Sequence, residues 1–193
     1  MSRVYELCYK REVVNGKALV AVIGVLFFIL ATALGAYVRI PIAGSPVPIT
    51  LQTFFVILSG AVLGKRLGLY SQLGYILLGS MGLPIFQGAA FGVSSLLGPT
   101  GGYLAGFMAA AYLVGRLTNG VSDTRRALLS FAIGSLLIYA FGVSWLVYIY
   151  RVNLMHAISI GMLPFIPGDI VKISFAAIIY SRISQRSKSV FSA

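Results

Sequence analysis

Two charged side chains stand close together in an otherwise apolar stretch near the end of the chain. Asp169 and Lys172 are three residues apart in the segment LPFIPGDIVK. On a helix this spacing places both side chains on one face, where the carboxylate accepts hydrogen bonds and the ammonium donates them. A buried ion pair with no other role can be replaced by packed apolar residues at little loss of stability. We therefore expect the pair to contact a polar ligand, the alternative being an ion pair that fixes this helix against its neighbours.

Further candidates for ligand contact lie in or beside two segments rich in Gly and Pro. Residues 39–50 read RIPIAGSPVPIT, and residues 83–102 read LPIFQGAAFGVSSLLGPTGG. Amide and phenol groups there could recognise polar ligand atoms, and a phenyl ring could stack on a ligand; these groups belong to Gln52, Gln87, Tyr103 and Phe86. Gln52 could equally face a neighbouring helix, and Phe86 could serve in packing alone.

The residue types argue against catalysis and metal binding. With a single cysteine, Cys8, and a single histidine, His156, the chain cannot build a cysteine-based metal cluster. Asp169 has no second carboxylate nearby for acid and base chemistry, because the other acids are predicted on the cytoplasmic side: Glu6, Glu12 and Asp123. The segment GAVLGKR lacks the spacing and the Ser or Thr of a phosphate-binding loop. We expect no enzyme, no cofactor and no nucleotide site.

The composition places these residues in a membrane. Of the 193 residues 59% are hydrophobic and only 10% are charged, and the mean hydropathy is +0.94. A soluble domain has about 25% charged residues, so we predict an all-α integral membrane protein forming one domain. Six segments have the apolar character of transmembrane helices, the second, third and fourth being short enough to be tilted or broken. They are residues 18–38, 49–63, 67–83, 102–115, 127–148 and 164–180.

The basic residues give the orientation of this chain, whose formal net charge is +11. Lys and Arg concentrate in cytoplasmic loops of membrane proteins. Here they precede the first predicted span, follow the sixth, and occupy alternate connections; the residues are Arg3, Lys10, Arg11, Lys17, Lys65, Arg66, Arg116, Arg125, Arg126, Arg182, Arg186 and Lys188. The opposite side has only Arg39 and Arg151. Both ends of the chain are therefore predicted in the cytoplasm, and the basic charge requires no nucleic acid partner.

Small residues recur at helix-packing spacings in the first predicted span. In lipid such residues let two backbones approach closely. They could pack within the protein or form a docking surface for a partner, and they are Ala18, Ala21, Gly24, Ala31 and Gly35. On the outer side, residues 39–50 and 83–102 are nearly free of charge and are predicted to form a compact, partly buried cap, where plain turns are the alternative.

Four segments in order along the chain resemble the BioY family, the biotin-specific substrate-capture subunits (S components) of energy-coupling-factor (ECF) transporters. They are PVPITLQTFFVILSGAVLG from Pro46, YILLGSMGLPIF from Tyr75, LLGPTGGYLAGF from Leu96 and LPFIPGDIVK from Leu163. The family has six helices with both termini in the cytoplasm, as the charges predict here. Many relatives carry polar or charged residues where this chain has GAAFGVSS, which leaves the partner of the biotin carboxylate unassigned.

The resemblance implies capture of biotin beneath an outer lid formed by residues 39–50 and 83–102. Asp169 would accept the ureido N–H groups and Lys172 would donate to a ligand oxygen, with a surrounding shell formed by Thr50, Gln52, Phe86, Gln87 and Tyr103. It also implies partners: a transmembrane coupling subunit, docking at the small residues of the first span, and two cytosolic ATPases of the ABC type. The setting implied is the bacterial cytoplasmic membrane.

Three other functions compete with this interpretation. The same machinery could carry another small vitamin, because the capture fold is shared across substrates. A self-sufficient carrier could use Asp169 as a proton site, although the chain shows no internal repeat typical of such carriers. An intramembrane enzyme could use Asp169 and Lys172 as an acid and a base.

Overall fold

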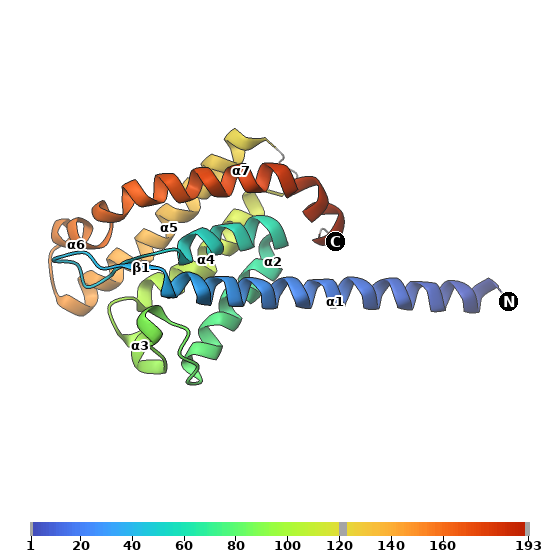
Figure 1. The fold of residues 1–193 in the computed structure, drawn as a ribbon, viewed down its shortest axis with the longest axis horizontal. Helices are drawn as coiled ribbons and strands as arrows, with labels where there is room; N and C mark the ends of the chain where they lie inside the picture. The colour runs from blue at the N-terminus through green and yellow to red at the C-terminus, as the bar shows by residue number, and fades with distance from the viewer. Residues whose placement is uncertain (1, 120–122, 192–193) are drawn as a thin grey trace.

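The structure, a computed structural model, describes the backbone of residues 2–119 and 123–191, with side chains described for residues 16–119 and 123–184. The described chain is nearly all helical and forms one bundle (Figure 1). Its elements, in chain order, are α1 (Ser2–Tyr37), β1 (Arg39–Ile40), β2 (Ile49–Thr50), α2 (Gln52–Ser80), the 3-10 helix η1 (Gln87–Ala89), α3 (Val93–Leu97), α4 (Gly101–Leu117), α5 (Thr124–Tyr150), α6 (Leu154–Gly161), the 3-10 helix η2 (Leu163–Phe165) and α7 (Ile166–Phe191).

Long apolar helices confirm the predicted class of an all-α membrane protein. Within the described residues, four helical stretches are long and apolar enough to cross a bilayer; they are Gly16–Tyr37, Gln52–Ser80, Thr124–Tyr150 and Leu154–Ser184. The last of these includes α6 and η2 as well as most of α7. The predicted fourth span corresponds to α4, which has only 17 residues. The number of membrane crossings stays a prediction.

Helix α2 contains a sharp turn where a loop between two predicted spans was expected. Gly64 has φ +81° and ψ 174°, which divides α2 into two arms that match the predicted segments 49–63 and 67–83. Only glycine backbones allow both arms to pack on α4, because a Cβ at Gly60 would lie 2.2 Å from the Ala111 carbonyl oxygen and one at Gly115 would lie 2.5 Å from the Lys65 nitrogen. The predicted connection at Lys65 is thus a helix kink, and α2 and α4 make the most extensive contact of the fold.

The connections at the opposite end are structured, and each is hydrogen-bonded to the helices (Figure 1). Segment 39–50 closes a short antiparallel hairpin in which Arg39 pairs with Thr50, a strand pair that the sequence did not reveal. The Ser45 hydroxyl donates a hydrogen bond to the Ile160 carbonyl oxygen at 2.6 Å, and the Tyr37 hydroxyl donates one to the Pro84 carbonyl oxygen. Both segments that were predicted to form a cap are therefore tied to the helical body.

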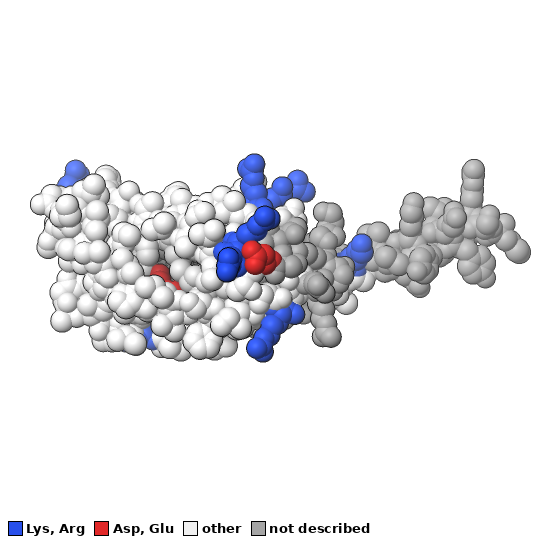
Figure 2. Space-filling model, turned by 90° about the horizontal axis from the view of Figure 1, so that it is seen from above, with Lys and Arg blue, Asp and Glu red and all other residues white. Residues whose placement is uncertain are grey.

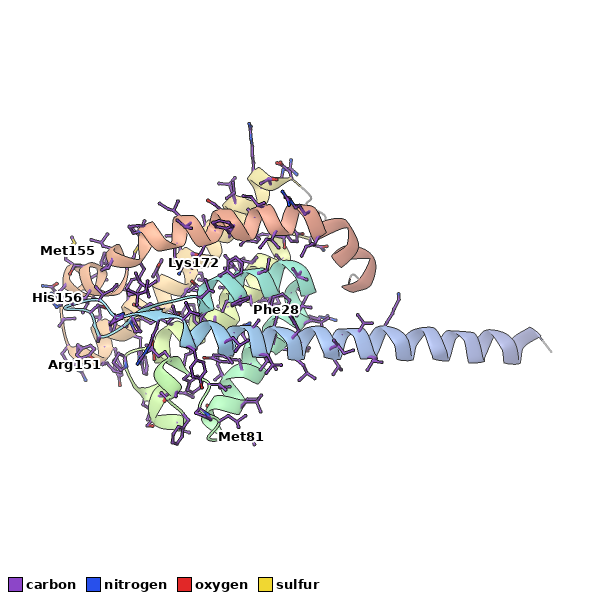
Figure 3. All side chains as sticks on the ribbon, in the orientation of Figure 1. Phe28, Met81, Arg151, Met155, His156 and Lys172 are labelled. Carbon is purple, nitrogen blue, oxygen red and sulfur yellow. The ribbon has the colours of Figure 1, made fainter. Side chains whose placement is uncertain are left out.

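The charges divide between the two ends of the molecule. Figure 2 shows most described Lys and Arg side chains gathered toward one end of the body. Arg116 near the end of α4 and Arg125 at the start of α5 belong to this end, which also includes the α2 kink. Arg151 follows α5 at the other end, where Figure 3 shows it together with Met155 and His156. The charge distribution has the asymmetry expected of a cytoplasmic and an outer face, although the side chains of Arg3, Lys10, Arg11, Arg186 and Lys188 lie outside those described.

The small residues of α1 do not share one environment. Ala31 and Gly35 are buried, and a Cβ at Gly35 would lie 3.1 Å from the Gln52 backbone nitrogen. These two residues pack within the protein, so the prediction that they form a docking surface is wrong. Ala18 is exposed, while Ala21 and Gly24 are half-buried, and they are flanked by exposed apolar side chains. Among the five residues, Ala18, Ala21 and Gly24 remain accessible at the surface, and their role in docking stays a prediction.

Candidate ligand-binding site

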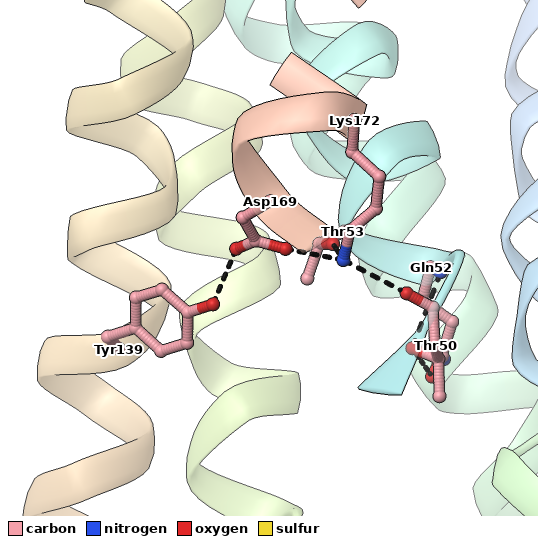
Figure 4. Close-up of polar contacts among 6 residues, drawn as sticks. All are labelled: Thr50, Gln52, Thr53, Tyr139, Asp169 and Lys172. Atoms are coloured by element: carbon pink, nitrogen blue, oxygen red, sulfur yellow. Dashed lines mark hydrogen bonds and ion pairs between the residues drawn. The ribbon is translucent and has the colours of Figure 1, made fainter. Parts of the chain in front are cut away.

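The predicted pair of charges lies at the start of α7. Asp169 is in the first turn of this helix, where the positive end of the helix dipole stabilises a carboxylate. Its Oδ1 forms an ion pair with the Lys172 ammonium, and the carboxylate is buried, with 5% of Asp169 exposed (Figure 4). The structure thus confirms that the two side chains share a helix face.

A tyrosine from α5 completes the surroundings of the carboxylate. The Tyr139 hydroxyl donates a hydrogen bond of 2.5 Å to Asp169 Oδ2, and the residue is 7% exposed (Figure 4). Nothing in the sequence singled out Tyr139, because it occupies one of many aromatic positions in an apolar span. The two carboxylate oxygens are therefore held by groups from different helices, which fixes the plane of the carboxylate.

Lys172 connects α7 to the beginning of α2. Its Nζ donates hydrogen bonds to Thr53 Oγ1 at 2.8 Å and to the Thr50 carbonyl oxygen at 3.1 Å (Figure 4). An ammonium has three N–H donors, and the ion pair with Asp169 engages the third. A ligand oxygen that binds Lys172 must consequently replace one of these partners.

A second set of hydrogen bonds supports the cavity wall from behind. Gln52 Nε2 donates to the Tyr75 hydroxyl at 2.6 Å, and that hydroxyl donates to the Ile85 carbonyl oxygen at 3.0 Å. Gln52 Oε1 accepts a hydrogen bond from Thr50 Oγ1 at 3.2 Å. Gln52 therefore links the start of α2 to both outer connections. It lines the cavity and also contacts a neighbouring helical segment, so it has both of the roles considered for it.

Two aromatic rings lie against glycines that leave room for them. The Tyr103 hydroxyl donates to the Gly161 carbonyl oxygen at 2.6 Å, and a Cβ at Gly142 would lie 2.3 Å from the Tyr103 ring. Phe86 is 2% exposed, and a Cβ at Gly79 would lie 2.3 Å from its ring. Because any larger residue at either glycine would displace a ring, these glycines determine the shape of the site.

All seven predicted site residues line one cavity of about 50 Å³. The members named from the sequence are Thr50, Gln52, Phe86, Gln87, Tyr103, Asp169 and Lys172. The cavity has further lining residues that no sequence pattern indicated: Val47, Pro48, Thr53, Thr100, Leu104, Phe107, Ile138, Tyr139 and Phe165. Polar groups concentrate where α7, α5 and the start of α2 meet, and aromatic rings form much of the remainder.

The site offers hydrogen bonding and apolar contact for a small organic ligand. The carboxylate of Asp169 keeps lone pairs that can accept N–H donors, and Lys172 is the only cation among the described residues lining the cavity. No group of three or more metal-binding side chains occurs in the part of the chain that the structure describes. His156, considered above, is exposed in α6 and does not line the cavity.

Known proteins are similar to this chain in sequence and in fold. The model of the BioY family matches residues 10–189. The biotin transporter BioY of Thermotoga maritima is 41% identical over 158 residues, which cover 82% of this chain and 92% of that protein. The probable biotin transporter BioY of Pyrococcus horikoshii is 43% identical over 159 residues, covering 82% and 93% of the two chains.

A solved structure extends the similarity to three dimensions. The S-component for biotin from an ECF-type ABC transporter superposes with a TM-score of 0.81 at 26% identity, covering 89% of this chain and 94% of that one. The fold class and the resemblance inferred from four sequence segments are thereby confirmed. The chain belongs to the BioY family.

Proposed function

We propose that this protein captures biotin at the outer side of the bacterial cytoplasmic membrane, as the substrate-binding S component of an ECF-type ABC transporter. One observation supports this proposal above all. In a chain of the BioY family, a carboxylate, a phenol and an ammonium converge in a cavity with aromatic walls near the outer end of the bundle.

The chemistry of biotin matches this distribution of groups. Its ureido ring carries two N–H donors and one carbonyl oxygen, and its thiophane ring is apolar. In our proposal Asp169 Oδ1 and Oδ2 accept the N–H donors, with Tyr139 holding the carboxylate in place. The thiophane ring lies against Phe86 and Tyr103, where burial of apolar surface contributes about 25 cal/mol per Å².

Lys172 donates to a ligand oxygen, and two oxygens compete for it. Either the ureido carbonyl or the carboxylate tail can replace a present partner of the ammonium, such as the Thr50 carbonyl oxygen. Gln87 faces the same cavity, and its side chain has no hydrogen-bond partner among the described residues. We propose that its amide contacts the oxygen that Lys172 does not reach.

Biotin can enter only if the cavity enlarges. Pockets that hold small organic ligands measure roughly 300–1,000 Å³, whereas this cavity measures about 50 Å³. The hydrogen bonds from Tyr37 to Pro84 and from Ser45 to Ile160 hold the two outer connections on the bundle. We propose that these connections form a lid that moves outward to admit biotin and then closes over it.

Energy and release would come from other subunits. We propose that the chain works with a transmembrane coupling subunit and two cytosolic ABC ATPases, because its sequence has no nucleotide-binding loop of its own. The exposed stretch of α1 from Ala18 to Gly24 is the proposed docking surface for the coupling subunit.

Competition binding separates this proposal from capture of another vitamin. We would titrate labelled biotin into purified wild-type protein, with thiamine and riboflavin as competitors. The proposal predicts saturable binding that neither vitamin displaces. Displacement by either vitamin at concentrations comparable to biotin would contradict the assignment of the ligand.

A second experiment tests Lys172 and identifies its oxygen. We would compare biotin with its methyl ester in the wild type and in Lys172→Met. If Lys172 holds the tail, the ester binds weakly to the wild type, and Lys172→Met removes the difference. If it holds the ureido carbonyl, both ligands weaken in parallel in the variant. Unchanged biotin affinity in a folded Lys172→Met protein would show that Lys172 does not contact biotin.

Cellular uptake tests the remaining alternative of a self-sufficient carrier. The proposal predicts that biotin uptake requires the coupling subunit and the ATPases. Uptake that persists without them and collapses with the proton gradient would favour a proton-coupled carrier using Asp169.

A further inference from the structure

A second hollow lies on the outside of the bundle, over α4. It measures about 670 Å³, and its lining contains no charged side chain. Gly101, Ala105 and Met108 contribute from α4, while Ile76 of α2 and Phe141 of α5 form opposite walls. Because small residues form much of the α4 surface here, this helix is recessed between its neighbours. We call this hollow the α4 groove.

The groove is built by close contacts between backbones, so it is a fixed feature of the fold. A Cβ at Gly101 would lie 1.7 Å from the Leu96 carbonyl oxygen, and one at Gly102 would lie 2.2 Å from Trp145 Cβ. These contacts bring the start of α4 directly against α3 and α5. The groove occupies the outer half of the bundle, since α4 begins and α5 ends at the outer end.

A row of three side chains leads from the groove to the end of α5. Trp145 lines the groove, and its indole N–H donates to the Gly98 carbonyl oxygen at 2.8 Å, which fixes the ring. Its ring centroid lies 5.6 Å from that of Tyr148, and Arg151 Cζ lies 5.4 Å from the Tyr148 centroid. Six residues of helix place Arg151 about 9 Å beyond Trp145 along α5.

This arrangement is complementary to one class of molecule. Trp and Tyr concentrate at the level of lipid headgroups, and basic side chains there attract lipid phosphates. Arg151 is exposed at the outer end of the molecule, and among the described residues no acidic side chain pairs with it (Figure 3). Below it lies a groove with apolar walls that is large enough for part of a hydrocarbon chain.

We propose that the α4 groove binds one acyl chain of a phospholipid from the outer leaflet, with the phosphate of that lipid at Arg151. Of the residues that line this groove, only Leu104 also lines the ligand cavity, and the proposal does not depend on the identity of the transported ligand.

The chain itself supplies the probe for a test, because Trp145 is its only tryptophan. We would titrate phosphatidylglycerol with brominated acyl chains into the purified full-length protein in detergent and follow tryptophan fluorescence. Bromine quenches on contact, so a bound chain gives quenching that saturates near one lipid per protein and keeps this stoichiometry when the detergent concentration is doubled. Quenching that follows only the ratio of lipid to detergent would overturn the proposal.

Matched variants test whether the brominated chain that quenches Trp145 lies in the α4 groove. Ala105→Phe fills the groove and should abolish the saturable component, whereas Ala109→Phe, a half-buried position one turn farther along α4 and outside the groove lining, should retain it. Ser144→Phe narrows the groove from an exposed position of α5, and it replaces Ala105→Phe if that variant does not fold. Saturable quenching that survives in a folded groove variant would overturn the proposal.

Arg151→Gln tests the headgroup contact. A basic residue near a membrane surface contributes about 1 kcal/mol, so phosphatidylglycerol should bind about fivefold more weakly, while brominated diacylglycerol, which lacks a phosphate, should be unaffected. Equal weakening of both lipids would contradict the phosphate contact.

Analytical sedimentation tests whether a second copy of the chain occupies the groove instead. A wild-type dimer that Ala105→Phe dissociates, together with an absence of saturable quenching, would assign the groove to a second copy and overturn lipid binding.

Discussion

The hydrogen bond from Tyr139 to Asp169 offers a sensitive test of how the site works. Tyr139→Phe removes one hydroxyl and keeps the ring that packs in the core. Both residues are at least 90% buried, so water cannot easily replace the lost donor. A hydrogen bond to a charged group contributes about 1.5–3 kcal/mol, and 1.4 kcal/mol corresponds to a tenfold change in affinity. If the carboxylate must be held by Tyr139 to accept ureido N–H groups, biotin should bind about 10- to 150-fold more weakly.

A control variant separates this effect from a general loss of stability. Tyr180 is also a buried tyrosine, and its hydroxyl donates to the Thr118 carbonyl oxygen at 3.1 Å. It does not line the ligand cavity, and it packs with Val114 and Phe131 in a second hydrophobic cluster, here called the inner core. Both tyrosine-to-phenylalanine variants should lower the unfolding temperature modestly, but only Tyr139→Phe should weaken biotin binding in calorimetric titration. Biotin affinity within twofold of wild type in Tyr139→Phe would refute the argument that this hydroxyl positions Asp169.

Three further substitutions test the aromatic wall, the lid and the docking surface. Gly142→Ala places a Cβ against the Tyr103 ring and should weaken biotin binding at least tenfold in a calorimetric titration. The control Gly134→Ala clashes with Val114 in the inner core, and it should lower stability but leave the affinity for biotin unchanged. Tyr37→Phe removes the hydrogen bond to the Pro84 carbonyl oxygen, so biotin should dissociate about two- to tenfold faster in a chase experiment. Tyr70 is equally exposed at 52%, and the control Tyr70→Phe should not change this rate. Equal dissociation rates in the wild type and both variants would argue against a lid held at Pro84. Gly24→Leu should reduce biotin uptake by cells while purified protein binds biotin normally, whereas Val22→Leu on the same helix should transport normally; full uptake by Gly24→Leu would exclude this stretch as the docking surface.

Apolar composition and basic loops made much of the fold predictable. Lipid as solvent requires long apolar helices, so the segments 18–38, 127–148 and 164–180 are visible directly in the sequence. The kink at Gly64 could not be predicted, because the basic pair Lys65 and Arg66 is typical of a loop between two spans. In the structure the positive φ of Gly64 turns the chain within α2, and the segments on both sides remain helical. The β1–β2 pair involves only two residues on each side, too few to produce an alternating pattern.

The site was predictable where residue type was unusual for its surroundings. Asp169 and Lys172 stand out because charges are rare in membrane spans. Tyr139 and Thr53 do not, since a tyrosine or threonine in an apolar helix is common, and only the crossing of α5, α2 and α7 brings them to the charged pair. The same reasoning explains why Ala31 and Gly35 were misassigned: small residues permit close approach, but the sequence does not say whether the approaching helix is α2 or a partner.

A structure of this protein determined with biotin bound would show directly whether Asp169 and Lys172 hold the ligand. We expect the ureido N–H groups within hydrogen-bonding distance of Asp169, a biotin oxygen in contact with Lys172, and the thiophane ring packed on Phe86 or Tyr103. Biotin bound away from Asp169 and Lys172, with their ion pair and the Tyr139 hydrogen bond unchanged, would show that these residues do not form the biotin site.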